Sequence, residues 1–206
     1  MTQRYFITGT DTECGKTWTT VKLAARYITN HQTVSCFKPL ASGADITSDG
    51  LRNDDALQLQ ACASQQRPYQ QVNPYCFAPA IAPHIAAQQA KVTIDLDTIV
   101  TPILAADTDI TLIEGFGGWL APVDMQTETI LWQADIAREV NAEVILVVGM
   151  KLGCLNHAQL SINQIKQDGL NIAGWIANPI DPHMPVYAEN LATLEALLEV
   201  PRLLRN

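Results

Sequence analysis

The sequence predicts an α/β fold with a mainly parallel sheet and helices on both faces, and two observations predict it. Short, continuous apolar runs recur at residues 5–8, 34–37, 110–113, 144–148 and 173–177, separated by helical patterns. Continuous apolarity indicates strands that are buried on both faces. The second observation is a glycine-rich segment that joins the first run to a helical pattern. In such sheets ligands bind beyond the carboxyl ends of the strands, so we expect the functional residues there.

Length and composition favour one globular unit with no nucleic-acid partner. With 206 residues, the chain has the length of one α/β domain, and we expect a single domain over residues 1–206. Its 48% of apolar and 17% of charged residues are typical of a folded rather than a disordered protein. The formal net charge of −8 disfavours a broad surface for nucleic acid. Any anion must therefore be held locally, by loops and helix ends.

The cysteines and the apolar runs indicate a cytoplasmic protein. The five cysteines are odd in number, scattered and without a C-x-x-C pair: Cys14, Cys36, Cys62, Cys76 and Cys154. This pattern predicts reduced thiols rather than a disulfide framework or a zinc site. The chain enters its first strand directly, and no apolar run approaches the ~18 residues that a membrane span needs. We therefore expect neither secretion nor a membrane partner.

Residues 9–17 have the sequence GTDTECGKT and predict a phosphate-binding loop. Glycines let the loop fold tightly, and the N–H groups at the following helix start would point at the phosphates. Lys16 would reach the outer phosphates, and the Thr17 hydroxyl would ligate Mg²⁺. Five residues separate Gly9 from Gly15, where the general P-loop pattern has four. The strand before and the helix after favour a P-loop NTPase-like fold over a plain glycine-containing turn.

Helical patterns follow the loop and recur towards the end of the chain. The first has an expected apolar face at Val21, Ala24, Ala25 and Ile28. Two later faces consist of Leu155, Ala158, Ile162 and Ile165, ending near Gly169, and of Tyr187, Leu191, Leu194 and Leu198. Residues 67–83 contain four prolines and predict a surface loop, after which a short helix begins at His84.

Two polar segments follow the second run. Pro39 ends that strand and keeps Lys38 extended, which places its ammonium beside the phosphate loop if the first two strands are neighbours. A surface lysine is the equally weighted alternative. Asp54 and Asp55 begin a predicted helix, where carboxylates usually act as caps or dipole partners. Mg²⁺ ligation is the sharper hypothesis, because the cation wants one or two carboxylates besides Thr17 and phosphate oxygens.

Three later strand ends carry further candidates. Glu114 ends the third run, where an acid in a P-loop fold commonly lies on the Mg²⁺ side of the nucleotide. Gly115 and Gly117 behind it permit close approach of the backbone to a ligand. Residues 149–157 form a second glycine-rich turn into a helix, a candidate anion site for a carboxylate. Asn178 could pair with the polar edge of a base or start a turn before proline.

Taken together, these motifs resemble the dethiobiotin synthetase family from Tyr5 to about Leu203. The resemblance rests on GTDTE at 9–13 with GKT at 15–17, Lys38-Pro39 with Ser42-Gly43, Asn53 with Asp55, EG at 114–115 with GGW at 117–119, KLGC at 151–154 with NHA at 156–158, and AGW at 173–175 with Ala177-Asn178. The five-residue spacing between Gly9 and Gly15 is the spacing that this family uses.

The resemblance implies an ATP-dependent ligase of biotin biosynthesis. The substrates would be 7,8-diaminononanoate, CO₂ and ATP, and the products dethiobiotin, ADP and phosphate. One amine would take up CO₂ as a carbamate, the γ-phosphoryl group would activate it as a carbamic-phosphoric anhydride, and the other amine would close the ureido ring. The resemblance also implies an obligate homodimer whose sites lie at the interface.

The resemblance assigns roles residue by residue. The implied catalytic residues are Lys16, Lys38 and Thr12, and the implied Mg²⁺ ligands are Thr17, Asp55 and Glu114. Nucleotide binding is implied for Glu13, Gly15, Lys16, Thr17, Asp55, Glu114, Gly115, Gly117, Asn178 and Pro201. Substrate binding is implied for Thr12, Ser42, Gly153, Cys154, Leu155 and Asn156, the last four reaching the substrate carboxylate in the partner subunit.

Two alternatives compete with this function. A relative of the cobyrinate-amidating enzymes would normally carry a glutaminase domain, which does not fit in 206 residues. A nucleotide-binding paralogue with lost or altered catalysis could act as a regulatory or assembly partner. Two departures from the family motivate this second alternative: Phe116 in place of a small residue, and an end at Asn206 before a helix usual in the family. Pro179 in place of an acid is a further departure. Retention of both lysines and both metal-facing acids argues against it.

Overall fold

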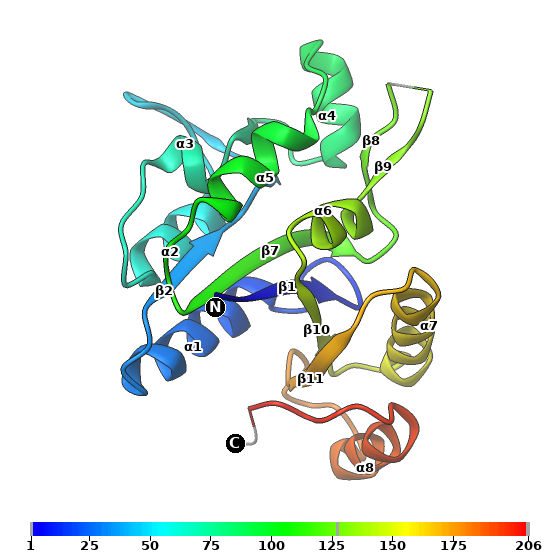
Figure 1. Ribbon diagram of the computed structural model, residues 1–206. Coiled ribbons are helices and arrows are strands. Elements are labelled where there is room, and N and C mark those ends of the chain that lie inside the picture. Colours follow the sequence, from blue (N-terminus) through cyan, green and yellow to red (C-terminus); the bar gives the residue numbers. More distant parts are fainter. Residues whose placement is uncertain (1, 127, 205–206) are drawn as a thin grey trace.

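The computed structural model describes residues 2–126 and 128–204, and its centre is a five-stranded parallel sheet (Figure 1). The strands are β1 (Gln3–Gly9), β2 (Val34–Phe37), β7 (Ile110–Gly118), β10 (Glu143–Gly149) and β11 (Ile172–Asn178). Their order is β11-β10-β1-β7-β2, and every neighbouring pair is parallel. Each apolar run predicted as a strand lies in one of them, which confirms the α/β fold with a parallel sheet.

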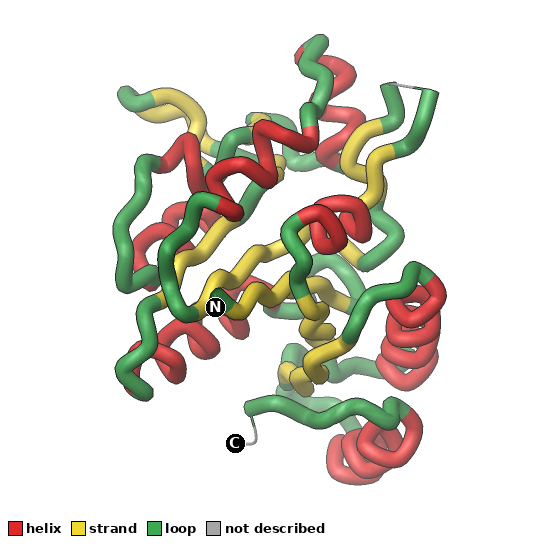
Figure 2. Tube along the Cα trace, viewed as in Figure 1, coloured by secondary structure: helices red, strands yellow, loops and turns green. Residues whose placement is uncertain are grey.

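Helices cover both faces of this sheet, as predicted. One face packs on α1 (Lys16–Thr29) and α2 (Asp54–Cys62), and the other on α5 (Leu96–Leu104), α6 (Gln133–Glu139) and α7 (Cys154–Gln167). Successive strand residues point to opposite faces: Phe6 belongs to the cluster with α5 and α6, and Ile7 to the cluster with α1 and α2. Figure 2 shows the strands at the centre with helices around them.

The first two strands of the sequence are not neighbours. β7 lies between them and pairs with β1 on one side and with β2 on the other. Lys38, directly after β2, is therefore separated from the phosphate loop after β1 by the width of β7. The condition under which we expected Lys38 beside the loop is wrong. Any link between the two must run through the end of β7, where Glu114 lies.

The buried face of α1 differs from the prediction. The buried residues are Lys16, Thr19, Thr20, Leu23 and Ala24, whereas Ala25 and Ile28 are exposed. The helix starts with polar residues that face the sheet, and the Thr20 hydroxyl donates to the Lys16 carbonyl oxygen at 2.8 Å. The Thr20 hydroxyl is thereby satisfied within the helix, which lowers the cost of its burial, whereas Thr19 Oγ1 is buried with no hydrogen-bond partner among the described residues. A search for apolar residues at helical spacing does not count these threonines. It therefore places the buried face of α1 about one residue too far towards the C-terminus.

Residues 67–83 are not a plain surface loop. They contain α3 (Tyr69–Val72) and β6 (Tyr75–Phe77), which pairs in parallel with β3 (Leu40–Ser42). The prolines lie at element boundaries, with Pro68 as the N-cap of α3 and Pro83 in the first turn of α4 (Pro83–Ala90). The buried Tyr69 ring anchors the segment, and its hydroxyl accepts the Asn53 N–H at 2.8 Å. Burial of aromatic residues therefore decides the structure of this proline-rich stretch.

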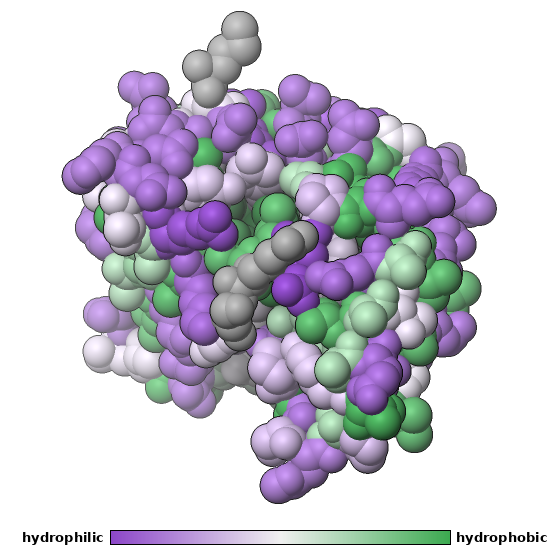
Figure 3. Space-filling model, turned by 90° about the horizontal axis from the view of Figure 1, so that it is seen from below, coloured by the Kyte–Doolittle hydropathy of each residue, from purple (hydrophilic) through white to green (hydrophobic). Residues whose placement is uncertain are grey.

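The remaining elements complete the fold. Two hairpins were not predicted, β4 (Asp45–Thr47) with β5 (Gly50–Arg52) and β8 (Pro122–Asp124) with β9 (Leu131–Trp132). The predicted helix before Gly169 is α7, which ends at Gln167, and α8 (Tyr187–Leu197) packs beside it through Leu194. Among the described residues, no helix combines the length and apolarity needed to cross a membrane. The face in Figure 3 is largely hydrophilic, with smaller apolar groups between.

Candidate active site

The phosphate loop between β1 and α1 is fixed to the ends of β10 and β11, which lie on one side of β1. The N–H of Thr10 donates to the Val147 carbonyl at 3.0 Å, and the Thr10 hydroxyl accepts from Gly149 N–H at 3.2 Å. From the end of β11, Asn178 Nδ2 donates to the Cys14 carbonyl at 2.9 Å. A Cβ on Gly15, which has φ of +87°, would lie 1.9 Å from that same nitrogen. Gly15 is therefore required by both its backbone conformation and this close approach.

The loop leads directly into the start of α1, an anion-binding geometry. Its N-cap residue is Gly15, which has no side chain to cap this N-terminus. The first-turn N–H groups of a helix lack carbonyl partners within the helix and carry the positive end of its dipole. Lys16 and Thr17 occupy this first turn, so backbone donors, an ammonium and a hydroxyl start from one place. Such a terminus suits phosphate groups.

Lys16 is held at the mouth of the loop although it is only 7% exposed. Its Nζ donates to the carbonyl oxygens of Asp11 at 3.1 Å and Gly117 at 2.9 Å. Burial is the main cause that lowers the pKa of Lys16, and the Lys38 ammonium adds to it, against the raising influence of Glu114 and Asp55. A bound phosphate would place a negatively charged partner beside this ammonium, which donates to two carbonyl oxygens.

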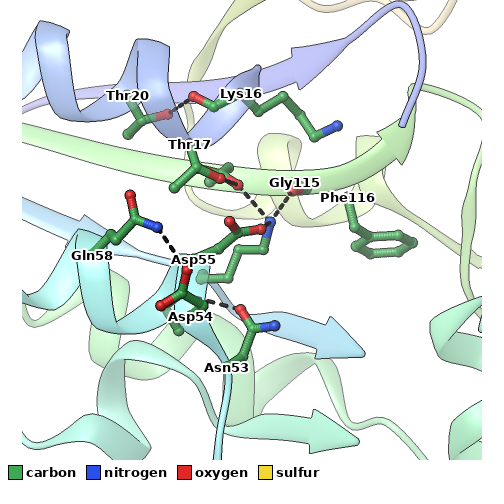
Figure 4. A network of polar contacts seen from close by, with 12 residues as sticks. Lys16, Thr17, Thr20, Asn53, Asp54, Asp55, Gln58, Gly115 and Phe116 are labelled. Atoms are coloured by element: carbon green, nitrogen blue, oxygen red, sulfur yellow. Dashed lines mark hydrogen bonds and ion pairs between the residues drawn. The ribbon is translucent and has the colours of Figure 1, made fainter. Parts of the chain in front are cut away.

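A second cluster centres on the buried side chain of Glu114, which is 1% exposed. Figure 4 shows three other members of this cluster, Thr17, Asp55 and Gly115, close together. Its Oε1 accepts from Lys38 Nζ at 2.5 Å and from Thr17 Oγ1 at 2.9 Å. Lys38 Nζ also donates to the Gly115 carbonyl at 3.1 Å and lies 3.4 Å from Asp55 Oδ2. The side chains come from α1, α2, β7 and the end of β2. The fold thus brings together residues that are distant in sequence.

The charge balance of this cluster keeps Lys38 protonated. Burial alone would lower the pKa of Lys38. The carboxylates of Glu114 and Asp55, through charge and hydrogen bonding, outweigh burial and raise the pKa above its ordinary value. The two lysines therefore differ: Lys38 is a cation paired in advance with carboxylates, and Lys16 is bound to backbone oxygens alone.

The same cluster fits a hard divalent cation. Glu114 Oε2 is buried and has no hydrogen-bond partner among the described residues. Burial of a carboxylate oxygen without a partner is unfavourable in free energy, and a bound cation or donor would offset this cost. Thr17 and the 44% exposed Asp55 side chain add a hydroxyl and a second carboxylate. Mg²⁺ prefers such oxygen ligands and usually keeps waters or phosphate oxygens for its remaining positions.

Comparisons with known proteins agree with the motifs. The profile of a family described as an AAA domain matches residues 3–205. The ATP-dependent dethiobiotin synthetase BioD of Chromohalobacter salexigens is 47% identical over 208 residues, covering 96% of this chain and 86% of that protein. Those of Pseudomonas aeruginosa UCBPP-PA14 and Aeromonas salmonicida are 46% and 42% identical, covering 96% and 98% of this chain and 86% and 88% of theirs. The chain belongs to the dethiobiotin synthetase family.

Solved structures of other proteins support the fold. The septum site-determining protein MinD from Pyrococcus horikoshii, solved with Mg-ADP, aligns with a TM-score of 0.54 at 17% identity, over 98% of this chain and 79% of its own. This similarity concerns the architecture alone. Together with the parallel sheet and the loop after β1, it confirms the P-loop NTPase-like fold.

Several residues to which the dethiobiotin synthetase family assigns a role meet at the end of β7. The contacts above link Lys16, Thr17, Lys38, Asp55, Glu114, Gly115 and Gly117. Thr12 and Glu13 are exposed in the phosphate loop, where Glu13 has a left-handed φ of 59°. Ser42 ends β3, and its carbonyl accepts from Asn53 Nδ2 at 3.3 Å. The family roles of these residues remain predictions.

Two residues assigned to nucleotide binding, Asn178 and Pro201, have hydrogen bonds outside this cluster. Asn178 uses its Nδ2 to hold Cys14, so one part of its amide already supports the loop. Pro201 runs beside β11, where its carbonyl accepts from Trp175 N–H at 3.0 Å. This hydrogen bond of Pro201 is to β11 and not to another predicted site residue. Nucleotide binding by Asn178 and Pro201 therefore stays a prediction.

The turn before α7 lies beside the phosphate loop of the same chain. Lys151 Nζ and Asp11 Oδ2 form an ion pair at 2.8 Å, which lowers the pKa of Asp11. Cys154 is only 1% exposed in the core, and its N–H donates to the Lys151 carbonyl at 3.0 Å. Its side chain and N–H are thus used within the chain. Leu155 and Asn156 are in the first turn of α7, where backbone N–H groups have no helical partner.

Three polar contacts were missed from the sequence. They are the Asp11–Lys151 ion pair, the hydrogen bond from Asn73 Nδ2 to the Lys38 carbonyl, and the buried amide of Gln133 beneath β7. Asp11 lies inside the recognised motif, but its partner is 140 residues away. A glutamine at a helix start is normally exposed, so nothing in the local pattern singles out Gln133.

Proposed function

We propose that this chain is an ATP-dependent dethiobiotin synthetase. It would carboxylate 7,8-diaminononanoate with CO₂ and close the ureido ring at the expense of ATP, releasing ADP and phosphate. The observation that carries the proposal is the convergence of two lysines on one strand end. Lys16 from α1 and Lys38 from the end of β2 both contact the end of β7, with Glu114 beside them. The paralogue without catalysis is not favoured, because this cluster is fully formed.

Each group has a role in phosphoryl transfer, which depends on positioning and on cations that meet developing negative charge. The start of α1 and Lys16 would hold the phosphates of ATP. Lys38 would face the carbamate and its phosphorylated form as a cation that remains protonated. Mg²⁺, held by Thr17, Asp55 and Glu114, would neutralise charge on the phosphate oxygens. Glu13, Gly15, Gly115 and Gly117 would line the nucleotide, with Asn178 and Pro201 near the base.

The diamine and its carbamate would lie between the phosphate loop and β3, at Thr12 and Ser42. We further propose a homodimer in which residues 153–156 reach the substrate carboxylate in the partner subunit. The support is a first helical turn with available N–H groups and the neighbouring Leu152, which is 97% exposed. We also propose a cytoplasmic location, which is compatible with five free cysteines.

A matched pair of lysine variants on α1 tests the proposal. Lys16→Gln removes the buried ammonium of the phosphate loop, and turnover should fall roughly 10²-fold or more. Lys22→Gln is the control, because Lys22 is exposed and lies over the Trp18 ring, 3.6 Å from its centroid. Dethiobiotin formation is followed by mass spectrometry with ATP, Mg²⁺, bicarbonate and the diamine. Equal turnover in both variants would contradict the proposed role of the loop.

A further inference from the structure

The side chain of Gln133 is completely buried at the first residue of α6, beneath the end of β7. Its Oε1 accepts the Phe116 N–H at 3.0 Å. Its Nε2 donates to the carbonyl oxygens of Phe116 at 3.1 Å and Gly118 at 2.8 Å. The amide therefore forms hydrogen bonds with both the N–H and the carbonyl of Phe116, as a neighbouring strand would.

Gln133 binds the part of β7 that extends beyond its pairing with β2. β2 pairs with β7 only as far as Ile113, and the pairing with β1 has a register shift between Ile7 and Gly9. The segment 115–118 therefore lacks a regular ladder. Gly115 fits this arrangement, because a Cβ there would lie 2.2 Å from Gln133 Oε1 and 3.0 Å from the Phe6 ring. The close approach of the amide to the strand requires a glycine.

The backbone groups bound by Gln133 alternate with those bound by the two lysines. The Gln133 amide bonds to backbone groups of Phe116 and Gly118. Lys38 Nζ bonds to the Gly115 carbonyl, and Lys16 Nζ bonds to the Gly117 carbonyl. All four lie on one short segment, so a shift of one set moves the other. The start of α6 is itself fixed, since Trp132 N–H donates to Asp135 Oδ2 at 2.8 Å. A rigid helix end thereby sets the carbonyl positions to which both ammonium groups bond.

We propose that Gln133 is a positioning residue for the reaction, which sets the spacing of Lys16 and Lys38 through the end of β7. The inference rests on the proposed function. The hydrogen bonds of its buried side chain go to the backbone of β7, so its influence should fall on turnover more than on KM. A misplacement of about 1 Å far from the chemistry can cost roughly 10²-fold in rate.

Two substitutions and one control test this role. Gln133→Met keeps the length and loses every hydrogen bond, and kcat should fall roughly 10²-fold with a small change in the KM for the diamine. Gln133→Glu keeps the acceptor and regains a donor only when protonated. Its kcat relative to wild type, measured at each pH, should therefore rise as the pH falls. Gln60→Met is the control, because Gln60 donates to the Arg67 carbonyl at 2.8 Å, a comparable contact outside the site.

The outcomes are separable. A kcat for Gln133→Met near that of wild type, or a loss no larger than that of Gln60→Met, would overturn the proposal. If Gln133→Met does not fold, the pH series of Gln133→Glu decides, and a ratio independent of pH overturns it. If the wild-type protein makes no dethiobiotin, the proposed function fails, and the rate of ATP hydrolysis then tests Gln133. A hydrolysis rate equal to that of the wild-type protein in both Gln133 variants would then reject the inference as well.

Discussion

Glu114 and Lys38 form a buried ion pair whose two members depend on each other. Both side chains are nearly inaccessible, with 0% and 6% exposure. Taking two charges out of water is costly, and mutual attraction with further hydrogen bonds offsets that cost. Thr17 and the Gly115 carbonyl supply such bonds. Removing one partner therefore affects stability as well as catalysis, so a loss of activity alone cannot define the role of Lys38.

Lys38→Met should abolish turnover and also lower the free energy of unfolding by about 3–5 kcal/mol, because Glu114 is left buried without its cation. The double variant Lys38→Met/Glu114→Gln removes both charges, so it should be more stable than Lys38→Met while remaining inactive. Urea unfolding of the three proteins measures this. A double variant less stable than the single one would show that the ion pair does not govern this cluster.

The lowered pKa of Lys16 predicts a pH dependence of ATP binding. Because burial lowers this pKa in the folded protein, Lys16 is neutral in part of the range below the model-peptide value of 10.5. In that window the unfolded chain binds more protons, so the contribution of Lys16 to stability improves as pH rises. Bound phosphates favour the ammonium, so binding takes up a proton there and the affinity falls as pH rises.

Calorimetric titration with ATP at increasing pH measures this effect. Lys16→Arg is the control, since a guanidinium stays protonated throughout this range. Its affinity should vary less with pH than that of the wild-type protein. Equal pH dependence of the two proteins would mean that Lys16 does not titrate in the binding range.

At the scale of elements, the orientation of α1 connects the phosphate loop to the core. Leu23 is 3% exposed, whereas Ile28 is 37% exposed. Leu23→Ala should lower the free energy of unfolding by about 2–5 kcal/mol because it leaves a cavity. Ile28→Ala should change it by about 0.5 kcal/mol or less. Similar losses for both variants in chemical denaturation would restore the apolar face predicted from periodicity.

The five strands of the sheet were predictable because continuous apolar runs are unusual outside doubly covered sheets. Their order was not, because the sequence does not show that β7 separates β1 from β2. For the same reason Lys38 and Glu114 could each be selected as strand-end candidates, but their direct contact could not be foreseen. Gln133 could not be selected from the sequence, because its hydrogen-bond partners are backbone groups of another element. Such partners do not depend on residue type and so do not appear in a sequence pattern.

At the scale of the whole molecule, the proposed sites require two subunits. Leu152 lies next to the segment that would reach into the partner. Leu152→Asp should weaken the dimer by placing a charge in an apolar contact, and sedimentation velocity should show a shift towards monomer. Leu160→Asp is the matched control at another exposed leucine, with 60% exposure. A wild-type protein that is monomeric at all concentrations would reject the shared site while leaving the family assignment intact.

Transfer of a carbon label from bicarbonate into the product tests whether the converging lysines and carboxylates serve ureido ring closure. The purified protein is incubated with 7,8-diaminononanoate, Mg²⁺, ATP and ¹³C-bicarbonate, and the products are analysed by mass spectrometry. We predict dethiobiotin that carries the label in its ring, formed together with an equal amount of ADP. Binding of ATP without any labelled dethiobiotin would contradict the account.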